Sequence, residues 1–387
     1  MSEKPISLSL DGSLIRQRAS TNDGDSKKVK IIDKQSVEYI VRSGIAGGVA
    51  GSAAKTLIAP LDRIKILFQT SNPDFLKYRG TFSGFYMAGK SIWKNDGILG
   101  LFQGHSVTLL RMFPYAAIKF VSYEQIRAIL IPHDAYETGF RRFMTGSLSG
   151  LGSVFLTYPL DLIRIRMAFE TKHVHTRGHN HLTLRRGKLI CTIQDIFAEI
   201  PARRANDPQW LKFMRNTLPP PLVSISNFYR GFAPTILGMI PYAGVSFFTH
   251  DLIHDIFRSR YLASWTVLGS SDKSSNIIRK SSNKHEVNSR DSRKPLRAYA
   301  QLIAGGLAGM CSQTAAYPFE VIRRRMQVGG AINQGQFLSF KETTRLIFRE
   351  SGLKGYFVGL TIGYMKVIPM GACSFFVYER SKAFLGI

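Results

Sequence analysis

A three-fold internal repeat constrains the fold of this chain more than any other feature of its sequence. Three six-residue segments align without gaps, and each has a proline, an acidic residue two positions later and a basic residue three positions after that. The segments are PLDRIK at 60–65, PLDLIR at 159–164 and PFEVIR at 318–323. Such self-similarity indicates one structural unit used three times.

A second pair of landmarks follows each segment in the same order. A glycine two positions after an aromatic residue occurs at 102–104, 229–231 and 357–359. An apolar stretch comes next, with a proline and then an acid ten positions later: Pro114 and Glu124, Pro241 and Asp251, Pro369 and Glu379. The first prolines of successive copies lie 99 and 159 residues apart, and the extra length falls in polar segments, chiefly 171–186, 200–222 and 260–296.

The apolar residues are clustered, although the mean hydropathy of −0.03 is that of a soluble protein. Residues 231–249 and 298–319 contain no Asp, Glu, Lys or Arg, and about 20 apolar residues allow a helix to cross a bilayer. The pattern therefore predicts a membrane protein with hydrophilic loops. The expected helices cover 37–70, 105–130, 139–170, 233–258, 296–328 and 360–384.

Glycines recur at three- or four-residue intervals before each of the three proline segments. This spacing places small residues on one helix face, where a neighbouring helix can approach closely in lipid. We therefore expect helix contacts at Gly44, Gly48, Gly51, Gly146, Gly150, Gly305 and Gly309.

The formal net charge of +26 bears on the partners of the chain. No nucleic-acid motif is present and several basic residues lie inside apolar segments, which argues against a nucleic-acid partner. An anionic membrane surface or an anionic solute fits the charge better. The three cysteines show no ligand or disulfide spacing. Residues 1–36 lack the apolar core of a secretory signal and are expected to be a disordered tail.

These residues resemble the mitochondrial carrier family over about 37–385. The family motif, Pro-x-acid-x-x-base-x-base, is complete in the second copy, which ends at Arg166, and in the third, which ends at Arg325, whereas the first has Leu67 at its last basic position. Segments 56–69, 111–115 and 238–248 are similar to the coenzyme A branch of the family.

The resemblance implies an all-α membrane protein with six transmembrane helices in three pseudo-threefold repeats, joined by short amphipathic helices on the matrix side. It implies a monomer in the mitochondrial inner membrane, with both termini facing the intermembrane space. The expected parts are the tail 1–36, repeat 1 at 37–132, repeat 2 at 139–259 with polar insertions 171–186 and 200–222, a polar loop at 260–295, and repeat 3 at 296–387. Arg230 and Gly231 resemble a turn that binds cardiolipin.

The family pattern also implies a gate at the matrix end. A proline bends a helix, and charges beyond the bend are costly in a membrane unless they are paired or face water. The implied ion pairs are Asp62 with Arg164, Asp161 with Arg323, and Glu320 with Lys65. Gln69 and Gln327 are at positions that brace such pairs, whereas Ala168 leaves one brace missing.

A cytoplasmic gate is implied at the opposite end, by an acid followed three residues later by a base in each repeat. The expected pairs are Glu124 with His254, Asp251 with Lys382, and Glu379 with Arg127. Because histidine titrates near neutrality, we expect the gate that contains His254 to weaken at alkaline pH.

Four bases at mid-membrane depth have no obvious acid nearby in the sequence: Lys55, Arg111, Lys119 and Lys366. In a water-filled cavity they would form an anion site. Gly238 and Met239 resemble the contact point of nucleotide carriers, although a packing glycine beside a gap-filling methionine is the alternative. Tyr115 and Tyr242 could stack on adenine or belong to the aromatic belt.

The predicted function is transport of coenzyme A, or of a close adenine nucleotide derivative, into the matrix by alternating access, with antiport expected. An ATP-magnesium/phosphate or other adenine nucleotide exchanger is the alternative within the family, and a non-transporting membrane scaffold is an alternative of another class. No Walker loop, nucleophile–base pair or metal template indicates an enzyme or a cofactor. His173, His175, His179 and His181 could bind a metal, but a solvated loop is favoured.

Overall fold

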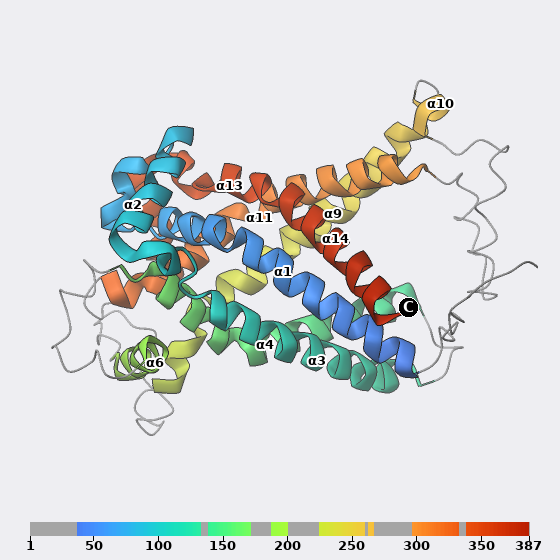
Figure 1. The fold of residues 1–387 in the computed structure, drawn as a ribbon, viewed down its shortest axis with the longest axis horizontal. Helices are drawn as coiled ribbons and strands as arrows, with labels where there is room; N and C mark the ends of the chain where they lie inside the picture. Colours follow the sequence, from blue (N-terminus) through green and yellow to red (C-terminus); the bar gives the residue numbers. More distant parts are fainter. Residues whose placement is uncertain are drawn as a thin grey trace, which may run out of the picture.

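The structure is a computed structural model that describes residues 37–132, 138–171, 187–199, 224–259, 262–266, 296–332 and 338–386. The tail 1–36, the His-rich tract and nearly all of the polar insertions and the polar loop lie outside the described residues. Within the described part, long helices run side by side and form an elongated bundle (Figure 1).

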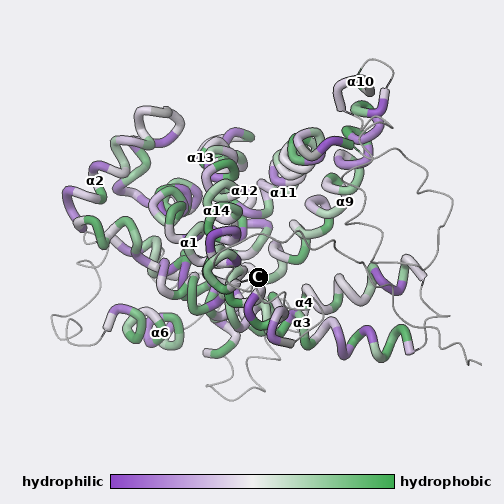
Figure 2. Tube along the Cα trace, turned by 45° about the vertical axis from the view of Figure 1, so that its right-hand side comes forward, coloured by the Kyte–Doolittle hydropathy of each residue, from purple (hydrophilic) through white to green (hydrophobic). Residues whose placement is uncertain are grey.

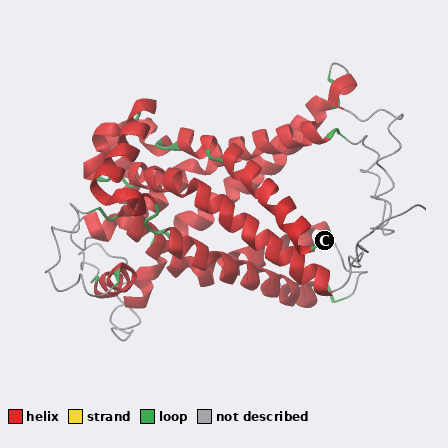
Figure 3. Ribbon diagram, in the orientation of Figure 1, coloured by secondary structure: helices red, strands yellow, loops and turns green. Residues whose placement is uncertain are grey.

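The long helices lie within four residues of their predicted bounds. They are α1 (Val37–Gln69), α3 (His105–Leu130), α4 (Gly139–Phe169), α9 (Phe232–Phe257), α11 (Ala298–Ile332) and a final pair, α13 (Leu360–Met365) and α14 (Val367–Leu385). Figure 3 shows that the described part of the molecule is built from helices. The expected all-α class is confirmed.

The last of the predicted long helices is divided, which the sequence pattern did not predict. The division falls at Lys366, three residues before Pro369. A proline lacks the backbone donor that would bond to the carbonyl one turn earlier, and its ring crowds that carbonyl. The loss of this bond accounts for a division at this point.

Shorter helices connect the long ones. They are η1 (Pro73–Tyr78), α2 (Phe82–Leu101), α6 (Lys188–Ala198), η4 (Asn227–Tyr229), α10 (Ala263–Thr266), α12 (Phe340–Ser351) and η6 (Gly352–Phe357). α2 and α6 lie at the left-hand end of the bundle in Figure 1, opposite the C-terminus. α12 begins with a capping box, in which Ser339 and Glu342 each bond to the other's backbone N–H.

The long helices pack most extensively across repeat boundaries: α1 with α14, α3 with α4, and α9 with α11. Glycine spacing identified the contact stripes only in part, because Gly51 meets Met112 and Gly48 meets Phe113, whereas Gly44, Gly146, Gly150, Gly305 and Gly309 face no neighbour within 4 Å. The buried small residues are instead Ala46, Ala50 and Ala54 in α1, Ser149 and Ser153 in α4, and Ala300, Ala304 and Ala308 in α11. Their methyl and hydroxyl groups are small enough for close helix packing.

Large apolar side chains are exposed along the long helices, and Figure 2 shows hydrophobic residues distributed along the whole length of these helices. Examples are Phe113, Phe120, Phe247, Phe248 and Ile368, all more than 60% exposed. Such a surface suits lipid. Two described segments, Ser224–Phe257 and Phe340–Leu385, are long and apolar enough to cross a membrane by composition alone.

Each repeat ties a short helix to its long helix through an ion pair whose arginine is buried. In the second and third repeats the last basic residue of the proline motif forms it: Arg166 with Glu199 at 2.9 Å, and Arg325 with Glu350 at 2.6 Å. The first repeat has Leu67 at that position, and Arg63 pairs instead with Asp96 at 3.3 Å.

Arg63 lies one helical turn before Leu67 and therefore on the same face of α1. Its guanidinium also donates to the Glu170 carbonyl of the second repeat at 3.1 Å. A base displaced by one turn thus supplies the missing link between α1 and α2 and joins repeats 1 and 2.

Replacing Arg63 with Leu should lower stability markedly, because the side chain is 1% exposed and its loss leaves Asp96 without a counter-ion. Breaking a buried pair in this way typically costs about 3–5 kcal/mol. Thermal unfolding in detergent measures the loss. The double substitution Arg63→Leu with Leu67→Arg returns the base to the position used by the other repeats and should recover part of it. An unchanged melting temperature in Arg63→Leu would rule out this role.

Candidate solute site and ionic ring

Three prolines place acidic side chains at equivalent depths in the bundle. Pro60, Pro159 and Pro318 lie inside α1, α4 and α11, and each is followed by an acid two residues later. Because a proline bends its helix, the three segments can converge at the end of the bundle where α2 and α6 lie.

The acids and bases of the proline segments pair across the helices. Lys65 lies 2.9 Å from Glu320, Arg164 lies 3.2 Å from Asp62, and Arg323 lies 2.5 Å from Asp161. These are the three pairs that the family pattern implies. We call these six residues the ionic ring. It ties α1, α4 and α11 to one another.

Two of the three ion pairs have a glutamine brace. Gln69 donates to Glu320 at 3.2 Å and to the Tyr317 hydroxyl at 3.0 Å. Gln327 donates to Asp161 at 3.3 Å and to the Tyr158 hydroxyl at 3.1 Å. The tyrosine hydroxyls in turn donate to backbone carbonyls at the starts of α13 and α9, those of Val358 and Arg230. Each brace therefore links an ion pair to a helix terminus.

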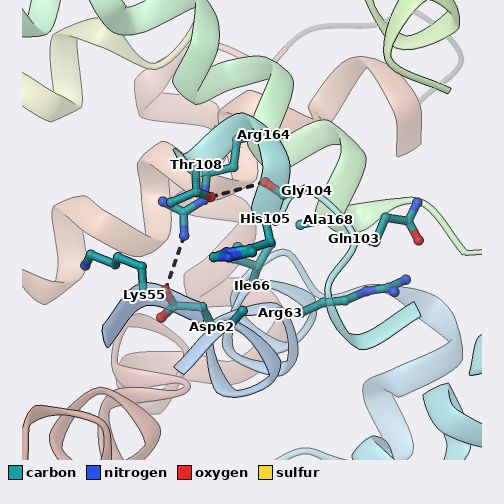
Figure 4. Close-up of a pocket in the computed structure, with 11 residues that line it drawn as sticks. Lys55, Asp62, Arg63, Ile66, Gln103, Gly104, His105, Thr108, Arg164 and Ala168 are labelled. Atoms are coloured by element: carbon teal, nitrogen blue, oxygen red, sulfur yellow. Dashed lines mark hydrogen bonds and ion pairs between the residues drawn. The ribbon is translucent and has the colours of Figure 1, made fainter. Parts of the chain in front are cut away.

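The third ion pair, Asp62 with Arg164, has neither brace residue. Ala168 is at the glutamine position, as predicted, and Ala59 is at the tyrosine position, which sequence reasoning missed. Together they leave a cavity of about 20 Å³ beside the pair (Figure 4), which is enough for one water molecule. Its lining also includes Lys55, Arg63, Ile66, Gln103, Gly104, His105 and Thr108.

Two of the bases expected to be unpaired have acid partners, so this part of the prediction is wrong. Arg111 lies 2.5 Å from Asp161, and Lys366 lies 2.9 Å from Asp62. The spacing along the sequence could not show this, because the partners are on neighbouring helices. Two acids of the ionic ring therefore bind bases of the candidate solute site as well as their own ring partners.

Arg324 is a further contact that sequence reasoning missed. It lies 3.3 Å from Asp161 and donates to the Gln327 side-chain oxygen at 3.1 Å. The run of three arginines at 323–325 was the available signal. Asp161, which is 2% exposed, thus has three arginine partners: Arg111, Arg323 and Arg324.

The other candidate solute residues differ in their surroundings. Among the described residues neither Lys55 nor Lys119 has an ion pair; Lys55 lies 3.7 Å from the Met370 sulfur and Lys119 is exposed. The Arg111 guanidinium lies over the Tyr115 ring at 5.7 Å. Met239 and Tyr242 are exposed.

Gly238 has a close neighbour that supports its packing role. A Cβ added there would lie 3.0 Å from the Phe319 Cβ, so the glycine lets α9 approach α11. The alternative that the sequence left open, a packing glycine, therefore has a specific contact behind it.

The predicted pairs at the opposite end are not formed. Within the described part of the chain, no ion pair joins Glu124 to His254, Asp251 to Lys382 or Glu379 to Arg127, and the three acids are exposed. The Lys382 ammonium instead lies over the Tyr378 ring at 5.4 Å, and the His250 and His254 rings are 4.1 Å apart. Among the described residues, the long helices of the three repeats are joined by ion pairs at the ionic ring.

Arg230, expected to bind a lipid phosphate, is bound to protein groups instead. It donates to Glu199 at 2.9 Å and to Asn227 at 2.7 Å. Gly231 has a φ of +77° and immediately precedes α9. The first backbone N–H groups of a helix have no acceptor within the helix. The backbone here remains suited to an anion, but the guanidinium is already engaged.

Glu170, immediately after α4, has a perturbed acidity. Burial, with a further contribution from the carboxylate of Asp195, raises the pKa of Glu170 from 4.5 to about 7. The folded protein therefore retains this proton over a pH range in which the unfolded chain has lost it. Burial of Glu170 therefore lowers the free energy of unfolding. This loss is absent at acidic pH, where the carboxyl is protonated in both states, and it increases as the pH rises from 4.5 towards 7.

Replacing Ala168 with Gln should supply the missing third brace. A hydrogen bond to a charged group contributes about 1.5–3 kcal/mol, so the melting temperature should rise by several degrees and transport should slow. Ala168→Leu is the matched control, since it fills the same cavity without a donor. If Ala168→Leu stabilises the protein as much as Ala168→Gln, cavity filling and not bracing explains the gain.

Comparisons with known proteins agree with this architecture. The family model described as mitochondrial carrier protein matches residues 36–134, 137–203, 223–261 and 294–387. A protein of Saccharomyces cerevisiae named mitochondrial carrier protein LEU5 is 53% identical over 364 residues, covering 92% of this chain and 93% of that protein.

More distant relatives are similar over almost the same length. The human protein named solute carrier family 25 member 16 is 34% identical over 350 residues, covering 89% of each chain. The Zea mays protein named mitochondrial carrier protein CoAc1 is 30% identical over 351 residues, covering 89% of this chain and 86% of that protein. The chain therefore belongs to the mitochondrial carrier family, whose members are multi-pass transporters of the mitochondrial inner membrane.

Proposed function

We propose that this carrier moves coenzyme A, or a close adenine nucleotide derivative, into the matrix by alternating access. The observation that supports this most strongly is that Arg111 and Lys366, from the candidate solute site, are bound to Asp161 and Asp62 of the ionic ring. Phosphate groups bind the same bases that these carboxylates bind. An anionic solute can therefore compete directly with the gate.

The competition supplies a route from binding to opening. Arg111 can hold phosphate oxygens with two parallel donors, and Lys366 offers a compact positive charge. Each base drawn to a phosphate leaves its ring acid with one partner fewer, which weakens the ionic ring. A ligand shifts such a balance only through its different affinities for the two states, and this exchange of partners provides the difference.

The opposite end would close as the ionic ring opens. Glu124, Asp251 and Glu379 are exposed and available, so the predicted cytoplasmic pairs could form when the helices tilt. We place the ionic ring at the matrix end and both termini in the intermembrane space. A monomer surrounded by inner-membrane lipid, cardiolipin among it, is the assembly that we propose.

Two other functions predict different results. An ATP-magnesium/phosphate or other adenine nucleotide exchanger would use the same bases, and Gly238 with Met239 suits both. A membrane scaffold would need neither the ionic ring nor bases coupled to it, because it moves no solute. The similarity of segments 56–69, 111–115 and 238–248 to the coenzyme A branch favours coenzyme A over the exchangers.

Uptake of labelled coenzyme A into liposomes that contain the purified protein tests the proposal, with ADP and ATP as competitors. Arg111→Ala should reduce uptake by about 10- to 100-fold, the worth of a charge-assisted hydrogen bond. Arg345→Ala, at an exposed position on α12, is the matched control and should transport normally. Brisk ADP or ATP exchange without coenzyme A uptake would assign the chain to an exchanger, and no transport of any of these solutes would favour the scaffold.

A further inference from the structure

Two histidines lie one turn apart near the end of α9. His250 and His254 are four residues apart, so they share a face of the helix. Their ring centroids are 4.1 Å apart and the ring planes meet at 30°. α9 leads towards α10 at the end of the bundle away from α2 and α6 (Figure 1). The pair is therefore remote from the ionic ring.

The spacing of the two rings suits a single metal ion. Zinc binds imidazole nitrogens at about 2.0–2.1 Å, so two nitrogens on one ion lie at most about 4.2 Å apart. The rings are already this close, so rotation about side-chain bonds brings both to one ion without movement of the helix backbone. Two histidines four residues apart on a helix are a recurring zinc-binding arrangement.

The ring nitrogens have the surroundings that a metal ligand needs. The Nε2 atom of His254 is buried and has no hydrogen-bond partner among the described residues, and leaving a buried polar atom unpaired is costly. The His250 side chain is 48% exposed, which gives an ion access to the pair, and the Asp251 carboxylate lies 3.9 Å from its Nδ1 atom. A carboxylate beside one ring nitrogen orients a histidine whose other nitrogen binds metal.

The local charge also favours a cation. Asp251 and Asp255 are exposed on this turn of α9 and carry two negative charges, against the single positive charge of Arg258. Within the described part of the chain, no third His, Cys, Asp or Glu completes a metal site. Water would therefore take the remaining positions around an ion bound here.

We propose that His250 and His254 bind a divalent transition-metal ion, and that zinc is the ion. Imidazole is a preferred ligand of zinc, whereas magnesium and calcium prefer oxygen ligands. Glutamate is also a zinc ligand, and the family pattern pairs Glu124 of α3 with His254 when this end closes. Resting on the proposed function, a bound zinc ion would then gain Glu124 as a third ligand, tie α9 to α3 and slow transport.

Calorimetric titration of the purified full-length protein with zinc, after removal of metals by a chelator, tests the site. Every protein in the titration carries glutamine in place of the four histidines of the His-rich tract, so the tract contributes no ligand. We expect one zinc ion per chain and no binding of magnesium. His250→Gln and His254→Gln should each weaken zinc binding by at least about tenfold, since losing a ligand costs no less than losing the group that orients it.

Arg345→Gln, at an exposed position on α12, is the control and should bind zinc as tightly as the tract-substituted protein. Zinc affinity that neither histidine substitution changes would overturn the site.

Uptake measurements separate this site from the proposed function. Zinc should slow coenzyme A uptake by the tract-substituted protein but not by its His250→Gln variant, which keeps His254 and Glu124. Equal inhibition of both proteins would contradict the tie between α9 and α3. Zinc binding that depends on both histidines, in a protein that takes up no coenzyme A, would support the site and reject the transported solute.

Discussion

A charged carboxylate inside a membrane protein must be paired or face water, and the structure depends on how Asp161 and Asp62 meet this requirement. The two acids recruit bases from neighbouring long helices, including Arg111 and Lys366. One set of contacts therefore holds the helices together and occupies the groups that an anionic solute needs. Gate and binding site share their side chains.

The three repeats are not equivalent in how they meet this constraint. Where the first repeat has Leu67, Arg63 supplies the pair with Asp96 from one turn away. Where the first repeat has Ala59 and the second has Ala168, nothing replaces the tyrosine and the glutamine, and a cavity remains beside Asp62. The loss of the base at position 67 is compensated by Arg63, whose ion pair with Asp96 links α1 to α2. The second departure leaves the Asp62–Arg164 pair without the tyrosine and glutamine contacts that brace the other two pairs.

The proline motif fixes the depth and helix face of each acid and base, and the resemblance to the family supplied which acid pairs with which base. Helix positions followed from the spacing of apolar residues. The partners of Arg111 and Lys366 could not be predicted, because they depend on distances between helices that are remote in sequence. The residues at the contacts between long helices were predicted only in part. Some glycines lie there, but most of the buried small residues are alanine and serine at four-residue spacing. The sequence also could not show that the guanidinium of Arg230, expected to bind a lipid phosphate, donates to Glu199.

Equilibrium binding of labelled coenzyme A to Asp161→Asn is the most direct test of competition between ring acids and solute. If Asp161 holds three arginines that the solute needs, the Asp161→Asn variant should bind coenzyme A about tenfold more tightly than the native protein. This is the effect expected when the solute no longer has to break one charge-assisted hydrogen bond. Glu320→Gln is the matched control, since among the described residues Glu320 forms an ion pair with Lys65 alone, and it should change affinity little. Unchanged or weaker binding by Asp161→Asn would contradict the account.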